Sequence, residues 1–154
     1  MRILFYPPKK LYKNAGLVDY LSTHLNNDAD HAVDQFGYSI GSGMKSALTW
    51  KREMFTWVCW LAGRPVAWGT LTPRFDSPNK FGISIFVSKD FRCSGMGTKL
   101  VKRIQKFVLQ NNLIIVASPW NKTGKDFYDK NKIAQTTNFD LWTQKIKCFP
   151  NENS

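Results

Sequence analysis

The apolar positions of this chain follow two spacings, one typical of strands and the other typical of helices. Short apolar runs bounded by proline, glycine or polar residues predict strands, which fall at residues 1–6, 54–62, 65–73, 81–87 and 113–119. Gly63 and Arg64 separate two of these runs and predict a hairpin. Apolar residues three and four positions apart predict helices over residues 15–27 and from Thr98 onward.

The remaining segments complete one folding unit. Residues 28–37 and 122–131 predict two shorter helices, residues 37–50 a glycine-rich loop, and residues 132–148 two final strands. Hairpin strands come first in this order, and a strand–helix–strand crossover follows. The pattern therefore predicts a single α+β domain over residues 1–154, with a mixed, mostly antiparallel sheet of about six to seven strands flanked by helices.

Composition narrows the class of protein. Hydrophobic residues make up 43% of the chain and aromatic residues 14%, as in folded globular proteins. No stretch reaches the roughly 18 apolar residues of a membrane span, and the apolar start is too short for a secretory signal. We therefore expect a cytoplasmic protein that does not enter a membrane. The cysteines and histidines have no zinc-ligand spacing, so no metal is expected; they are Cys59, Cys93, Cys148, His24 and His31.

Charge points to the kind of partner. The chain has 22 Lys and Arg against 11 Asp and Glu, a net charge of +11. Such an excess favours polyanions, namely a nucleic acid such as tRNA, a nucleotide cofactor or an acidic protein surface. The positive residues are spread along the sequence without a long basic block, which argues against a dedicated nucleic-acid-binding arm.

The most informative motif is FVSKDFRCSGMGTKLVKRIQKFV, residues 86–108. Gly95 and Gly97 let the backbone approach a ligand without a Cβ clash, and the helix that follows offers free N–H groups and the positive end of its dipole. A charge and two hydroxyl groups stand beside them, from Arg92, Ser94 and Thr98. The motif is neither a Walker loop nor a full GxGxxG, since Leu100 replaces the third glycine. It predicts a pyrophosphate site, and a turn that merely ends a strand is the alternative.

Here the chain resembles a known family. Residues 92–97, RCSGMG, match the R/Q-x-x-G-x-G/A signature of the GNAT acetyltransferases, after a strand ending in Val and before a long helix, as in that family. A second match is Asn121, followed seven positions later by Tyr128 within FYDKNKI. The resemblance covers roughly residues 55–133 and implies a GNAT-like fold whose strand–helix–strand core binds acetyl-CoA.

The resemblance also implies roles for particular residues. It implies a backbone N–H near Val87 as the oxyanion donor and Tyr128 as the general acid for the departing thiolate. A phenol with a pKa near 10 is suited to that step. The implied acetyl-CoA contacts come from the strand, the turn and the next helix: Ile85, Phe86, Val87, Arg92, Cys93, Ser94, Gly95, Met96, Gly97, Thr98, Asn121 and Tyr128.

One departure from the family bears on the acceptor. Many members carry a glutamate base on the strand before the turn, whereas FGISIFV has only Ser84 as a polar side chain. At pH 7 a lysine amine is neutral roughly four times in ten thousand, but an α-amine roughly one time in six. Without a base, an acceptor with a low-pKa amine is favoured. Other candidate bases elsewhere in the chain keep this open; they are Glu53, Asp76, Asp34 and His31.

These observations predict an acetyl-CoA-dependent N-acetyltransferase in which a primary amine attacks directly. The acceptor stays open between aminoacyl-tRNA, a protein N-terminus and a small-molecule amine. A basic chain without the glutamate looks similar to the toxin branch of the family, which acetylates aminoacyl-tRNA. The alternative is a nucleic-acid-binding or DNA/RNA-modifying protein, of phage type, on a GNAT-like fold. A module that coenzyme A only stabilises is a third hypothesis. Dimers are common in the superfamily, so a homodimer also remains open.

Overall fold

The computed structural model describes residues 1–27, 52–74, 79–118 and 122–135. Within these ranges one mixed sheet has the strand order β1-β2-β3-β4-β5. Neighbouring strands are antiparallel except β4 and β5, which are parallel. The strands are β1 Arg2–Tyr6, β2 Phe55–Leu61, β3 Arg64–Pro73, β4 Lys80–Val87 and β5 Ile114–Ala117.

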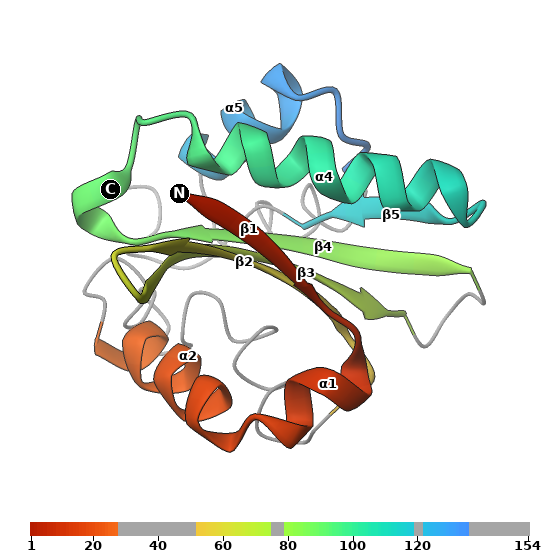
Figure 1. Ribbon diagram of the computed structural model, residues 1–154. Helices are drawn as coiled ribbons and strands as arrows, with labels where there is room; N and C mark the ends of the chain where they lie inside the picture. Colours follow the sequence, from red (N-terminus) through yellow and green to blue (C-terminus); the bar gives the residue numbers. More distant parts are fainter. Residues whose placement is uncertain (28–51, 75–78, 119–121, 136–154) are drawn as a thin grey trace, which may run out of the picture.

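Helices cover both faces of this sheet (Figure 1). On one face lie α1 (Pro8–Lys13) and α2 (Ala15–Asn27), and on the other lie α4 (Met96–Gln110) and α5 (Lys122–Lys130). A single 3₁₀ turn, η2 (Lys89–Phe91), follows β4. In the described ranges, no helix is both long enough and apolar enough to span a membrane.

The predicted α+β class and the mixed, mostly antiparallel sheet are confirmed. The described residues form five strands rather than six to seven, because most of the tail predicted to hold the last two lies outside them. Gln135 alone makes a parallel bridge to Ala117. The predicted helix at 28–37 and the loop at 37–50 also lie outside the described residues. Helix α1 was not predicted: Pro7 and Pro8 end β1 but also start a helix, because the fixed φ of proline suits a first helical position.

Two hydrophobic clusters fix the layers. Trp57, Leu71 and Ile83 pack with Leu100 and Ile104 of α4 on one face. Alternation along each strand sends the intervening side chains to the other face, where Val58, Trp68 and Phe86 meet the buried leucines of α1 and α2. Helix α4 can approach the sheet closely because β3 has a glycine at Gly69. A Cβ there would lie 2.8 Å from Cδ1 of both Ile104 and Ile85.

Candidate active site

The sheet opens between β4 and β5. Strand β5 pairs with β4 only over Lys80–Ile83, so no strand of the described ranges pairs with the last four residues of β4 on that side. The Ser88 N–H donates to Val66 O at 2.9 Å, and hydrogen-bonding positions alternate along an antiparallel pair. Residues 84 and 86 therefore bond to β3, whereas the N–H and C=O groups of Ile85 and Val87 point into the gap that β5 leaves.

Tyr128 fills the inner end of this gap. Its side chain is 8% exposed, and its hydroxyl has a hydrogen bond to the Ile85 backbone that favours the phenolate. The donor is therefore the Ile85 N–H. Burial outweighs this bond and raises the pKa of Tyr128 to about 12, above the expected value near 10. The hydroxyl thus keeps its proton at neutral pH, next to a backbone donor.

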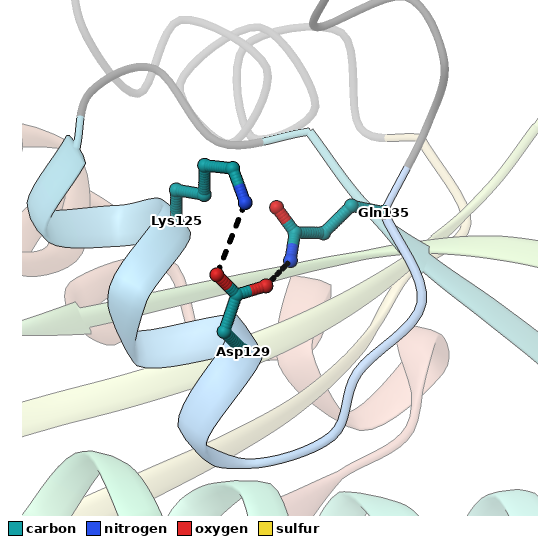
Figure 2. Close-up of polar contacts among 3 residues, drawn as sticks. All are labelled: Lys125, Asp129 and Gln135. Carbon is teal, nitrogen blue, oxygen red and sulfur yellow. Dashed lines mark hydrogen bonds and ion pairs between the residues drawn. The ribbon is translucent and has the colours of Figure 1, made fainter.

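The segment after α5 holds Tyr128 in place. Ile133 N–H donates to Tyr128 O at 2.9 Å, and the Ala117 N–H of β5 donates to Ala134 O at 2.8 Å. On the outer surface, Lys125 and Gln135 both bond to Asp129 (Figure 2). Such an exposed ion pair contributes little energy, but the contacts together fix the return of the chain toward β5.

The outer end of the gap is formed by the glycine-rich turn. Gly95 is the N-cap of α4, with φ +84° and no side-chain cap. It is exposed, and a Cβ built there would meet nothing within 4 Å. Cys93 and Ser94 are also exposed. A backbone this open, next to the unbonded N–H groups of the first turn of α4, fits a pyrophosphate.

Gly97 has a different role from Gly95. It is buried, and a Cβ there would lie 3.0 Å from Cε1 of Phe127 and 3.6 Å from Cγ2 of Val87. The second glycine of the motif thus lets α4 contact α5 and the end of β4. The sequence analysis did not predict this contact, because Gly97 and Phe127 lie on different helices and far apart in the sequence.

Arg92 turns toward β4. Its Nε donates to Val87 O at 2.9 Å, and its guanidinium carbon lies 5.9 Å from the centre of the Phe86 ring. The side chain therefore uses one of the backbone acceptors in the gap. The predicted pyrophosphate contact requires its other nitrogens or a different rotamer.

The other predicted contact residues have different surroundings. Phe86 is 2% exposed and packs on the α1–α2 face, and its backbone bonds to β3. Met96 is buried and Thr98 half-buried in the first turn of α4. Asn121 lies outside the described residues. The structure thus brings Ile85, Val87 and Tyr128 together, with the turn at 92–95 next along the chain.

One residue near the site was not predicted. His24 of α2 has Nε2 3.1 Å from Ser88 Oγ and packs against Tyr20, Trp68 and Phe86. It ties α2 to the residue that follows β4. These two positions are 64 residues apart, so no local pattern could have indicated the contact.

The sheet carries no acidic group. None of the five described strands contains Asp or Glu, and Glu53 is exposed just before β2. The other candidate bases, Asp76, Asp34 and His31, lie outside the described residues. Over the described ranges, no three His, Cys, Asp or Glu side chains are grouped so that they would hold a metal ion.

The described residues thus combine a parallel strand pair that separates beside a buried tyrosine with an open glycine turn at a helix start. The family described as Acetyltransferase (GNAT) family matches residues 29–132. The chain belongs to this family, which confirms the resemblance seen in the motifs. No curated protein matches the chain.

Solved structures agree on the fold. An aminoglycoside 6'-N-acetyltransferase bound to coenzyme A has TM-score 0.55 and 19% identity over 75% of this chain and 59% of its own. AAC(6')-Iy with a bisubstrate analogue, CoA-S-monomethyl-acetylneamine, has TM-score 0.57 and 13% identity over 88% and 93% of the two chains. Glucosamine-6-phosphate N-acetyltransferase from Arabidopsis thaliana has TM-score 0.53 and 14% identity over 89% and 95%. This chain spans just under three fifths of the first structure's length.

Proposed function

We propose that this protein binds acetyl-CoA and transfers the acetyl group to a primary amine of low pKa, with Tyr128 as the proton donor. The observation that carries the proposal is the pair formed by the Ile85 N–H and the Tyr128 hydroxyl inside the gap between β4 and β5. This pair supports the proposal because a backbone N–H and a phenol that keeps its proton lie next to each other, as acetyl transfer requires. Acetyl-CoA supplies the activated thioester, and structures of similar fold in complex with coenzyme A or a CoA bisubstrate analogue support this choice.

The cofactor fits the residues that face it. Ile85 and Val87 present backbone N–H and C=O groups along the gap, which suits an amide-bearing chain such as pantetheine. Gly95 and the start of α4 present an open, positively polarised backbone, which suits the pyrophosphate. The Ile85 N–H is a second candidate for the oxyanion contact, beside Val87, if a bound thioester oxygen takes the place of the Tyr128 oxygen as its acceptor.

The high pKa of Tyr128 limits what it does. Full proton transfer from a phenol of pKa about 12 to a thiolate with a conjugate-acid pKa near 8.5 is uphill by roughly 5 kcal/mol. Tyr128 therefore donates a hydrogen bond to the departing sulfur as negative charge develops there. The sulfur gains a proton as the newly acylated amine loses one. Tyr128 therefore stays neutral overall.

The acceptor follows from the missing carboxylate. No Asp or Glu stands on the described strands to take a proton from an ammonium group, which favours an amine that arrives neutral. Aminoacyl esters on tRNA, protein N-termini and weakly basic small amines meet this condition, whereas an ordinary lysine does not. The aminoglycoside and aminosugar substrates of the structural neighbours belong to the third group, and the net charge of +11 disfavours polycations among them.

The test is a thiol-release assay with acetyl-CoA and a panel of acceptors. The panel holds aminoacyl-tRNA, a peptide with a free N-terminus and small amines, with an N-terminally blocked lysine peptide as the negative control. Tyr128→Phe should lower kcat about 100-fold, the contribution typical of a general acid, and leave KM for acetyl-CoA nearly unchanged.

Tyr12→Phe is the matched control. Its hydroxyl also bonds to a backbone group, the Arg52 carbonyl, and burial also raises its pKa, but it lies on α1. It should keep the wild-type kcat. Equal kcat for wild type and Tyr128→Phe would refute the proton-donor role. If no acceptor releases thiol and acetyl-CoA does not bind, the alternative of a nucleic-acid-binding protein on this fold is favoured.

A further inference from the structure

Four basic side chains form a row on the outside of α4. Lys99, Lys102, Arg103 and Lys106 are all exposed and stand at positions i, i+3, i+4 and i+7, so they share one side of the helix. We call them the α4 basic row. Within the described part of the chain, none of them forms a hydrogen bond or an ion pair.

The position of the row on α4 is fixed by the neighbours of the helix. Phe107 packs against Phe5, Phe55 and Trp57 of β1 and β2. On the opposite flank, Gln105 Nε2 donates to Asn131 O beyond α5 at 3.3 Å. At 100° per residue the row is centred about 90° from Phe107 and about 110° from Gln105, so it lies between the two flanks and opposite the face that is buried on the sheet. All four side chains are exposed, so the row faces solvent on the outer side of α4, the helix that lies above the sheet in Figure 1.

This charge pattern is unfavourable for the helix itself. The residues of α4 include no Asp or Glu, so the i,i+3 and i,i+4 neighbours in the row repel each other with no compensating acid. The helix dipole favours anions in the first turn and cations in the last. Helix α4 has no acidic residue in its first turn and no basic residue in its last. Repulsion within the row that no favourable end charge offsets points to an anionic partner outside the helix.

We infer that the α4 basic row binds the phosphodiester backbone of a nucleic acid. The row extends about 10 Å along the helix, and a duplex presents one phosphate per roughly 1.7 Å of axis, so each cation has a phosphate within reach. The apolar face of α4 is buried against the sheet and cannot insert into a lipid surface. No aromatic side chain stands in the row, and aromatic anchors are typical of protein–protein contacts.

The row is distinct from the pyrophosphate turn. Acetyl-CoA bound at Gly95 would bring its phosphates near Lys99 but would leave the cations one and two turns further along α4 without a partner. The inference concerns a partner rather than the reaction, and it stands if the proposed transfer fails. If the acceptor is aminoacyl-tRNA, the same surface would also hold the substrate.

The test measures nucleic-acid affinity as a function of salt, without acetyl-CoA. The probes are labelled tRNA and a short random-sequence DNA duplex. The row variant carries Lys99→Gln, Lys102→Gln, Arg103→Gln and Lys106→Gln. A matched control removes four exposed cations elsewhere, with Lys9→Gln, Lys13→Gln, Arg64→Gln and Lys130→Gln, so both proteins fall by the same four charges.

The row variant should flatten the slope of log K against log salt by about 3 to 4, because each phosphate contact contributes about 0.7 to 0.9. The control should stay close to wild type. A double variant, Lys102→Gln with Lys106→Gln, should lose about half as much. The row variant should also melt no lower than wild type, since replacing the four cations removes repulsion within α4.

Three outcomes would overturn the inference. One is an equal loss in the row variant and the control, which would mean that diffuse charge alone attracts the nucleic acid. Another is wild-type affinity in the double variant. The third is a wild type that binds neither probe but does bind vesicles rich in anionic lipid, which would make the row a membrane contact.

Discussion

Alkaline stability tests the placement of Tyr128 without any ligand. The perturbation is Tyr128→Phe, which removes one hydroxyl from a side chain that is 8% exposed. Burial raises the pKa of this phenol to about 12 in the folded protein, against about 10 in an unfolded chain. Between these two values the folded protein keeps a proton that the unfolded chain loses.

The sign and size of the effect follow from this difference. Below pH 10 both states hold the proton, and the contribution of Tyr128 to the free energy of unfolding is fully present. As pH rises from 10 to 12 that contribution is lost. Two pKa units correspond to about 3 kcal/mol, a large share of the roughly 5–15 kcal/mol that stabilises a typical domain.

Urea unfolding followed at a series of alkaline pH values measures this loss. Other groups titrate as well, so the informative quantity is the difference between wild type and Tyr128→Phe. At neutral pH the variant should be less stable by about 1 kcal/mol, because the Ile85 N–H loses its partner. Above pH 10 this gap should close and then reverse. Two stability curves that stay parallel from pH 9 to pH 12 would refute the buried, hydrogen-bonded position of the phenol.

Two other variants test the packing that positions the site. Gly69→Ala should destabilise the protein by about 1–2 kcal/mol, since its Cβ would lie 2.8 Å from Ile104 Cδ1. Gly69→Ala should cost less when it is made in Ile104→Val, which lacks that Cδ1 atom, than when it is made in wild type. Urea unfolding measures both costs, and equal costs would contradict the contact. His24→Ala should cost about 1–2 kcal/mol through the lost Ser88 bond and ring contacts. Ser88→Ala should cost less, and a neutral His24→Ala would show that α2 is not held there.

Much of the fold could be predicted from local pattern. The apolar runs gave β1 to β5 within a few residues of their bounds, and the helical spacing gave α2, α4 and α5. Period and turn chemistry are properties of neighbouring residues, so a single sequence reports them directly. The GNAT motifs then supplied the long-range order that periodicity lacks.

The finer geometry of the site could not be predicted, because it depends on contacts between distant segments. Glycine spacing alone did not distinguish Gly95, which is open, from Gly97, which makes room for Phe127. The Arg92 side chain turns toward the Val87 carbonyl, which accepts its hydrogen bond, and β5 ends too early to pair with that carbonyl. The shift of the Tyr128 pKa depends on burial by the whole fold.

For the α4 basic row, the residues were visible in the sequence but their role was not. Its four cations were visible as the polar side of a helical pattern, and the scattered charge of the chain argued against a binding arm. Only the helix in place shows that they gather on one exposed side without a carboxylate among them. The four cations are close in the sequence, and it is the burial of the opposite face of α4 that leaves them together on the surface.

The most direct test of the central claim is calorimetric titration of acetyl-CoA and desulfo-coenzyme A into wild type, Gly95→Glu and Gly63→Glu. Gly63 is the matched control, since it has φ +76° against +84° for Gly95 and both have open space around a Cβ, so strain and added charge are the same. The account predicts micromolar binding by wild type and Gly63→Glu, and at least tenfold weaker binding by Gly95→Glu. No binding by wild type, or unchanged binding by Gly95→Glu, would contradict the assignment of this turn and gap to acetyl-CoA.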